Sequence, residues 1–411
     1  MIIALNILLL SAGASFGYMA SRKSELKIYY WPGLALKIIS GFALGLLYTH
    51  YYSGGDSLVM FNEATRVADI AFGSASSFID IYFYGDYSAI QEYAYILQPR
   101  AAFMTKVLAI LAWATNHNYW LTACYLSMFS FLGFWLAANT VYEIFGSKIT
   151  AVLPTLFFPS IVFWSSGVLK ESIAISSLVG VLAILLNTYY KKKIGWLNML
   201  LLLIGIFLIL YLKYYYAAML IVSFTTVFVA RVLLHGRNNW YIELASVLIV
   251  FSAILGIASL SHPNFWPSRF LSVITNNYSQ FIESSSSGNV VRFNDLAPTI
   301  SSFLFYSPKA LFAGLFYPLG MISFNIIKLA SVVENWVLLL SFIYAIRWFK
   351  IPKVKDDRLL LWAMLLFVIT TAVFITFSTP NLGTLARFKI GYMVVFVTLV
   401  TRVITNNLNS T

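Results

Sequence analysis

Long apolar segments alternate with short polar ones along nearly the whole chain. An α-helix needs about 20 mostly apolar residues to cross the hydrocarbon core of a bilayer. By this criterion the sequence holds twelve candidate hydrophobic segments, at 2–20, 31–51, 101–116, 119–137, 149–165, 171–189, 195–212, 215–235, 240–260, 323–346, 359–378 and 388–404. Two longer polar stretches, 52–100 and 261–320, interrupt them. The pattern predicts an all-α fold, a polytopic transmembrane helical bundle with about 11–12 hydrophobic segments.

The composition excludes the soluble classes of protein. Only 10% of the 411 residues are charged and 60% are apolar, whereas about 25% of a typical soluble domain is charged. The single cysteine, Cys124, can form no intrachain disulfide. Because no linker, repeat or composition shift is visible, we expect residues 1–411 to form a single integral membrane domain. The segment 2–20 lacks a basic n-region, and we interpret it as an uncleaved span rather than a signal peptide.

Basic residues predict the orientation of the bundle. Fourteen of the 27 lysines and arginines lie in four short loops and the C-terminal tail, at 21–30, 190–194, 231–238, 347–358 and Arg402. The positive-inside rule assigns these segments to the cytoplasm, with Lys191–Lys193 among them. The stretch 52–100 holds two arginines and six carboxylates, so we expect it outside. The N-terminus is then outside and the C-terminus inside, and 261–320 is a second external loop.

This topology contains one conflict. Four apolar segments lie between the external stretch 52–100 and the cytoplasmic lysines at 191–193, yet an odd number of crossings is required. The first suspect is 149–165, which contains Pro154 and Pro159, since broken backbone is tolerated at membrane depth where protein surrounds it. We therefore predict a broken hairpin over 149–171 that brings Ser166, Lys170 and Glu171 to the external face. The shorter segment 101–116 is the second suspect.

Asp56 is the first candidate for chemistry. It follows Gly54-Gly55 at the start of the first external loop and precedes apolar residues at helical spacing. The spacing predicts an amphipathic helix that lies in the membrane interface. Asp56 then stands at the mouth of a span, where a carboxylate can act as a base. The alternative is that it merely caps this helix, because Asp is a preferred N-cap residue.

Two further groups of charged residues are functional hypotheses. Lys170 and Glu171 lie within apolar sequence, where ionisable residues are costly, although a pair that snorkels to the interface is the alternative. Arg387 and Lys389 form a basic pair that is predicted outside, against the charge bias. A lipid phosphate would hold this pair, with Arg387 binding it bidentately. Further cations predicted outside are Arg100, Arg269, Arg292 and Lys309.

Several chemistries have no support in the sequence. The four histidines are dispersed, with no HExxH and no Cys/His pair, so no zinc site is indicated. Dependence on another divalent metal stays open. The sequence has no GxxxxGK[ST] loop and no GxSxG elbow, which leaves ATP hydrolysis and serine-hydrolase chemistry without a basis.

The order of these motifs resembles the GT-C superfamily of integral membrane glycosyltransferases, which take sugars from polyprenyl-phosphate carriers. The resemblance is carried by Asp56 at the mouth of the first external loop, Gln98-Pro99-Arg100 before the next span, a span ending in Tyr142-Glu143-Ile144-Phe145-Gly146, the Ser-Ser-Gly-Val-Leu-Lys-Glu turn at 165–171, and Asn381-Leu382-Gly383-Thr384-Leu385-Ala386-Arg387. The family's frequent Asp-Glu pair is absent, because Ser57 follows Asp56.

The resemblance implies an inverting hexosyl or pentosyl transfer on the extracytoplasmic face of a bacterial inner membrane. A sugar would pass from a polyprenyl-phosphate donor to a glycan or lipid acceptor, as in the synthesis of cell-envelope polysaccharide. Asp56 would be the general base. Fixed positive charge would bind the donor phosphate, from Arg387, Lys170 and Arg100. The remaining substrate contacts would come from Glu171, Ser166, Tyr52, Asn381 and Arg292.

Three other readings stay open. An O-antigen polymerase or ligase also uses lipid-linked sugars, and the arginines of 261–320 suit it. A flippase for lipid-linked glycans, or another transporter, would have broken helices and charged groups near the bilayer midplane, often in two related halves. A structural membrane subunit would need none of the intramembrane charges.

Overall fold

The structure is a computed structural model that describes residues 1–51, 55–88, 99–190, 194–234, 239–285, 288–320 and 326–408. These residues form 17 α-helices joined by short 3-10 and π-helical turns, and they confirm the all-α polytopic architecture. The chain divides into two compact units, Met1–Tyr214 and Tyr215–Thr411. The boundary falls one residue after Lys213, at a kink within α10 (Trp196–Leu233).

Nine helices in the described part of the chain are long and apolar enough to cross a membrane, so the protein is a multi-pass membrane protein. The shorter apolar helices are Ala101–Ala114, Lys148–Phe157 and Ile300–Phe316. The segments 195–212 and 215–235, expected as two spans, are the two parts of α10 (Trp196–Leu233), which meet at a kink. Within it Lys213 alone departs from helical geometry, with φ −146° and ψ 60°.

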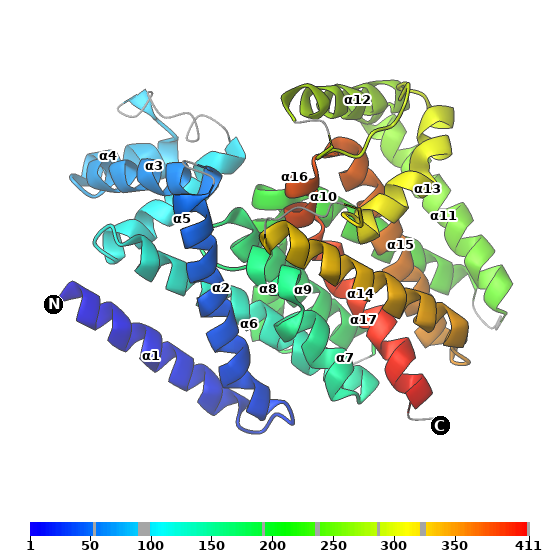
Figure 1. Cartoon of the computed structure of the whole chain (residues 1–411), viewed down its shortest axis with the longest axis horizontal. Coiled ribbons are helices and arrows are strands. Elements are labelled where there is room, and N and C mark those ends of the chain that lie inside the picture. Colours follow the sequence, from blue (N-terminus) through cyan, green and yellow to red (C-terminus); the bar gives the residue numbers. More distant parts are fainter. Residues whose placement is uncertain are drawn as a thin grey trace. The chain divides into compact units, whose positions relative to one another are not determined.

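The first unit is built around α6. The helix α6 packs against α2 on one side and α9 on the other (Figure 1). The helices of this unit are α1 (Ile2–Ser21), α2 (Tyr30–His50), α3 (Asp56–Ala71), α4 (Ala75–Ile79), α5 (Pro99–Ala114), α6 (Tyr119–Phe145), α7 (Lys148–Val152), α8 (Pro159–Trp164), α9 (Lys170–Tyr189) and the first part of α10.

The second unit is built around α15. The helices α11, α12, α13 and α17 all pack against α15, and α14 packs against α17. The stretch 261–320, expected as an external loop, contains an amphipathic helix and a short apolar one, α12 and α13. The helices of this unit, after the end of α10, are α11 (Trp240–Ser261), α12 (Pro267–Ser284), α13 (Ile300–Phe316), α14 (Ile326–Trp348), α15 (Lys355–Ser378), α16 (Leu382–Phe388) and α17 (Ile390–Leu408).

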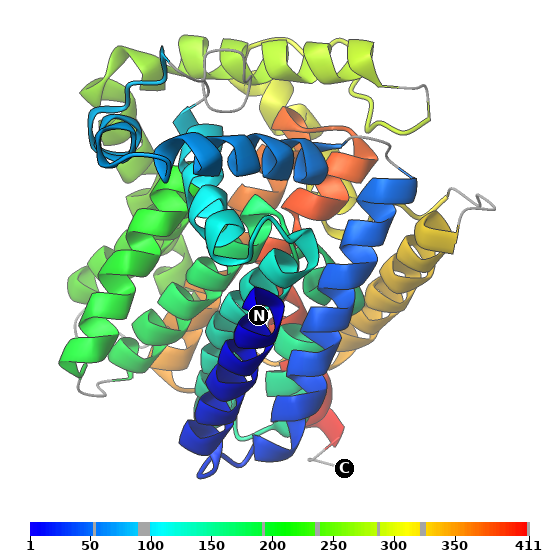
Figure 2. The ribbon, with the colours of Figure 1, turned by 90° about the vertical axis from the view of Figure 1, so that its left-hand side faces the viewer.

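The amphipathic helix predicted after Asp56 is α3, and it lies across one end of α2 (Figure 2). Its apolar face packs against α5 in a cluster that includes Met60, Val67, Leu108 and Ala112. We call this part of the first unit the α3 end. The start of α6 also lies here, because the Tyr119 hydroxyl is 2.8 Å from the Ser57 hydroxyl. Since α5 packs along α3 and is followed directly by α6, the second suspect, 101–116, is the segment that fits the odd number of crossings required by the predicted topology.

The proline-containing segment, by contrast, runs from one end of the unit to the other. At its start the Lys148 ammonium lies 3.8 Å from Glu25, in the loop before α2. At its far end the Ser57 hydroxyl donates to the Val168 carbonyl over 2.7 Å, after α2 has ended. The segment thus spans the same distance as α2. The expected break is present, as a π-helical turn at Leu153–Phe157 between α7 and α8. The expected hairpin is not present, because the segment ends at the opposite end of the unit from where it began.

Serine side chains explain how the non-helical backbone at 165–169 is tolerated inside the unit. The Gly167 amide donates to the Ser127 hydroxyl over 3.0 Å, and the Ser172 hydroxyl donates to the Gly167 carbonyl over 2.6 Å. The Ser166 hydroxyl donates to the Val162 carbonyl over 2.6 Å. Within a membrane protein such internal partners replace the water that irregular backbone would otherwise need.

Gly167 is the position in this loop where a side chain is least acceptable. Its φ is +66°, and an added Cβ would lie 3.1 Å from both Cα and the carbonyl oxygen of Gly41. We expect Gly167→Ala to destabilise the protein by about 1–3 kcal/mol, as strain and contact combine. The measurement is thermal unfolding in detergent. Gly146→Ala is the matched control, because Gly146 has φ +69° but open space around it; equal losses would contradict the contact with Gly41.

Candidate functional site

Asp56 is the first residue of α3 and is exposed. The N-cap of the helix is Gly55, whose backbone is extended, so Asp56 is not the N-cap that the alternative interpretation required. A carboxylate in the first turn still interacts favourably with the helix dipole. The side chain lies at the surface of the α3 end.

Ser57 ties the start of α3 to the start of α9. Its buried hydroxyl bonds to the Val168 carbonyl and to the Tyr119 hydroxyl, over 2.7 and 2.8 Å. Lys170, which is half-buried, begins α9 two residues after Val168. The α3 end therefore carries the predicted base and one predicted phosphate-binding cation on two neighbouring helix starts.

Glu171 and Ser166 lie inside the first unit rather than at its surface. Glu171 is 2% exposed, and its Oε1 lies 2.8 Å from the Nζ of Lys213, which is 5% exposed. Lys213 reaches this position from the one non-helical residue of α10. Ser166 is fully buried and bonded to backbone. Both residues were expected on the external face as substrate contacts, but both side chains are buried.

A buried lysine that the sequence analysis did not single out lies in the middle of α2. The ammonium of Lys37 donates to the Ser130 hydroxyl over 2.9 Å, to the Ser165 carbonyl over 3.1 Å and to the Ser165 hydroxyl. It also lies 4.0 Å from the ring centre of Phe134. Among the described residues, no carboxylate forms an ion pair with it. The detectable signal was a lysine at the centre of the apolar segment 31–51, a position that marks a functional hypothesis by default.

In the second unit, Asn381 organises the short helix α16. Its Oδ1 accepts from the amides of Gly383 and Thr384 over 3.0 and 3.1 Å, so Asn381 is the N-cap of that helix. Its Nδ2 donates to the Ser285 hydroxyl over 2.8 Å. The backbone before α16 also pairs with the segment that follows α12, through a bridge between Asn381 and Val290. Asn381 thus has a clear structural role beside the predicted one.

The backbone pairing brings another predicted residue, Arg292, close to α16. Arg292 is exposed, and its carbonyl accepts from the Lys309 ammonium over 2.7 Å. Arg387 is half-buried in the last turn of α16. Three residues expected to contact donor or acceptor, Asn381, Arg292 and Arg387, therefore belong to one region of the second unit.

Lys389, the other half of the predicted basic pair, is not a surface cation. It is 1% exposed, and its ammonium donates to Asn335 Oδ1 over 2.8 Å and to the Tyr317 carbonyl over 3.1 Å. Two protein groups hold this lysine, so it does not need the lipid phosphate expected for it.

Some predicted residues lie outside the description. Tyr52 and Lys191–Lys193 are outside the described residues, and only the backbone of Arg100 is described, in α5. Within the described ranges, no group of three or more His, Cys, Asp or Glu side chains could hold a metal ion. Comparison with protein families, curated proteins and solved structures finds no match to this chain.

Proposed function

We propose that the protein is a membrane glycosyltransferase that moves a sugar from a polyprenyl-phosphate donor to a glycan or lipid acceptor. The observation that carries this proposal is the α3 end, where the exposed Asp56 lies beside the start of α9 with its cation, Lys170. An acid–base group next to fixed positive charge suits group transfer from a phosphate. The resemblance to the GT-C superfamily supports the same reaction.

In the proposed reaction, Asp56 accepts the proton of the acceptor hydroxyl as its oxygen bonds to the anomeric carbon. The bond from that carbon to the phosphate oxygen breaks on the opposite side, which inverts the configuration. The leaving polyprenyl phosphate carries the negative charge away, and Lys170 at the start of α9 stabilises it. For the second unit by itself, we propose that Arg387 binds a phosphate group and that Arg292 and Asn381 contact donor or acceptor.

The proposed location is a bacterial inner membrane with the α3 end on the extracytoplasmic side. The support is the distribution of basic residues, which places the loop 347–358 in the cytoplasm and the acidic stretch 52–100 outside. A polyprenyl-phosphate sugar in the outer leaflet would then reach Asp56 directly.

The direct test uses the purified full-length protein in nanodiscs with radiolabelled polyprenyl-phosphate hexoses and pentoses and a mixture of envelope glycan acceptors. We expect time-dependent transfer of label with release of polyprenyl phosphate. The O-antigen polymerase or ligase alternative would instead give transfer only when the donor carries a preassembled glycan. Absence of transfer from every donor, with intact folded protein, would contradict both.

Arg387→Lys tests the phosphate-binding role. The substitution keeps the charge and removes the planar fork that binds phosphate bidentately. We expect donor binding to weaken about tenfold, or roughly 1.4 kcal/mol, without loss of thermal stability. Donor titration in nanodiscs measures this. Arg347→Lys, at the basic loop, is the matched control and should leave donor affinity unchanged; an Arg387→Lys protein with normal affinity would remove Arg387 from the site.

A transporter of lipid-linked glycans is the second candidate, and it is favoured by one specific observation. The segment broken at Leu153–Phe157 continues into α8, and Ser165 at the end of α8 accepts a hydrogen bond from Lys37 of α2. Broken helices and buried charge at mid-depth are features of transporters. Proteoliposomes that move a fluorescent polyprenyl-phosphate sugar between leaflets, without any transfer of the sugar, would support this candidate over the transferase.

A further inference from the structure

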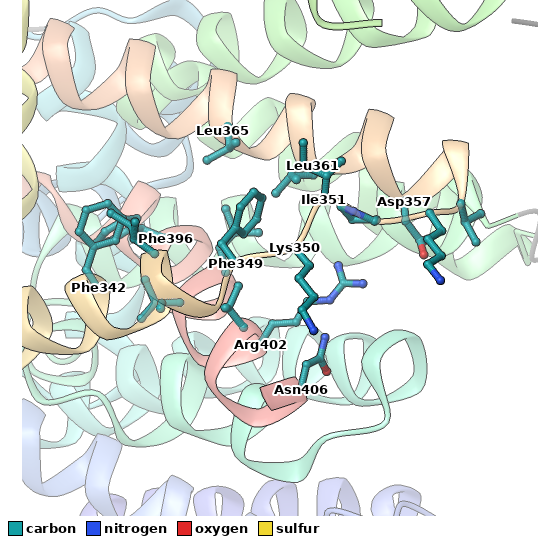
Figure 3. A pocket seen from close by; sticks show the side chains of 18 residues that line it. Phe342, Phe349, Lys350, Ile351, Asp357, Leu361, Leu365, Phe396, Arg402 and Asn406 are labelled. Atoms are coloured by element: carbon teal, nitrogen blue, oxygen red, sulfur yellow. The ribbon is translucent and has the colours of Figure 1, made fainter. Parts of the chain in front are cut away.

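The second unit contains a cavity that the proposed reaction does not use. It lies between α14, α15 and α17 and has a volume of about 510 Å³ (Figure 3), within the range of about 300–1,000 Å³ usual for ligand pockets. Most of its wall is apolar, including Phe342, Leu361, Leu365, Phe396, Leu399 and Val403. The wall also includes Ile346 and Phe349, which are 58% and 42% exposed, so the cavity opens to the surface.

Basic side chains lie at one edge of this cavity. The polar ends of Lys350, Arg402 and Asn406 lie together there, while the rings of Phe342 and Phe396 lie at the opposite end (Figure 3). Lys353 also lines the cavity, and Asp357 is the one carboxylate of the lining. The cavity is therefore amphipathic, with a cationic mouth and an apolar interior.

Two nearby carboxylates, Glu243 and Asp356, pair with other arginines. Arg358 forms a buried bidentate pair with Glu243, with both N–O distances 2.7 Å. Arg231 pairs with Asp356 over 2.8 Å. Within the part of the chain that the structure describes, neither Lys350 nor Lys353 has an ion-pair partner, and both are exposed. Lys350 and Lys353 therefore contribute positive charge at the mouth that no ion pair among the described residues offsets.

We propose that this cavity binds an anionic phospholipid, with an acyl chain in the apolar interior and the phosphate at Lys350 and Arg402. The basic loop 347–358 is predicted in the cytoplasm, and basic pockets between transmembrane helices on that side bind anionic headgroups. A soluble phosphate compound would leave the apolar wall exposed to water, and a neutral lipid would leave Lys350 and Lys353 without an anionic group. The site is independent of the proposed transferase reaction.

The test measures lipid retention by native mass spectrometry of the purified full-length protein in detergent. Phosphatidylglycerol and phosphatidylcholine with identical acyl chains are the probes, and we expect the wild type to retain the first preferentially. Lys350→Gln should weaken phosphatidylglycerol binding about fivefold, the factor for one basic residue near an anionic headgroup. Arg347→Gln removes a charge from the same loop but not from the cavity lining, and it should have little effect.

A second variant tests the apolar part of the site. Val403→Phe narrows the cavity from α17 without changing charge, and it should reduce retention of both lipids severalfold. Soluble glycerol phosphate should not displace phosphatidylglycerol from the wild type. Equal effects of Lys350→Gln and Arg347→Gln would overturn the proposal, as would displacement by glycerol phosphate, which would indicate a site for free phosphate.

Discussion

Asp56→Asn is expected to reduce sugar transfer about 10²–10⁴-fold, the contribution typical of a positioned general base. The amide keeps the size and shape of the carboxylate but cannot accept the proton of the acceptor hydroxyl. Because Asp56 is exposed and is not the N-cap of α3, the substitution should change thermal stability little. Donor affinity should also be retained, so the loss should appear in kcat rather than in KM.

Asp80→Asn is the matched control for this prediction. Asp80 is another exposed carboxylate of the same surface region, at the start of the π-helical turn Asp80–Tyr84. Its neutralisation changes the net charge by the same amount without touching the proposed site. Near-wild-type transfer by a folded Asp56→Asn protein would show that Asp56 is not the base, and an equal loss in Asp80→Asn would point to a general effect of surface charge.

Periodicity alone predicted much of the fold. The apolar segments predicted the helices, and the spacing after Asp56 predicted α3. The gap between the apolar segments 195–212 and 215–235 matches the kink at Lys213, beside which the two units divide. The units themselves were not predicted, because hydrophobicity does not show which helices pack together.

The assignment of the non-crossing segment illustrates why local signals were insufficient. Pro154 breaks the helix as expected, but the break does not decide where the chain goes next. The segment continues across the first unit because Ser127, Ser172 and other serines satisfy its backbone. These partners lie on α6 and α9, and their contact with the loop cannot be inferred from hydrophobicity. α5 has a similar apolar composition but packs on α3 instead.

The candidate site was predicted unevenly for the same reason. Asp56 and Lys170 were found because exposed or helix-starting charges at the end of a span are visible in the sequence. Lys37 was missed because one lysine scarcely lowers the hydropathy of segment 31–51, and its partners, Ser130 and Ser165, are distant in sequence. Glu171 was found, but its burial depends on Lys213. The sequence shows which residues carry charge. Which partner each charged side chain meets depends on how the helices pack.

The Glu171–Lys213 ion pair should show strong coupling between its two members. Both side chains are at least 95% buried, and their charged atoms lie 2.8 Å apart. Removing one partner leaves the other charge buried without its counter-charge, which typically costs about 3–5 kcal/mol. We therefore expect Glu171→Gln and Lys213→Met each to lower the thermal stability of the detergent-solubilised protein markedly. The double variant removes both charges and should recover much of the loss.

The double-mutant cycle distinguishes this ion pair from two independent packing effects. Coupled residues give an interaction energy of about 0.5–3 kcal/mol, whereas independent sites add within about 0.5 kcal/mol. The exposed pair between Lys148 and Glu25, at 3.8 Å, is the matched control, since surface ion pairs contribute about 0–1 kcal/mol. Additive losses for Glu171 and Lys213 would contradict the pairing. Strong coupling would show that the start of α9, which carries Lys170, is held in place by the bend in α10 at Lys213.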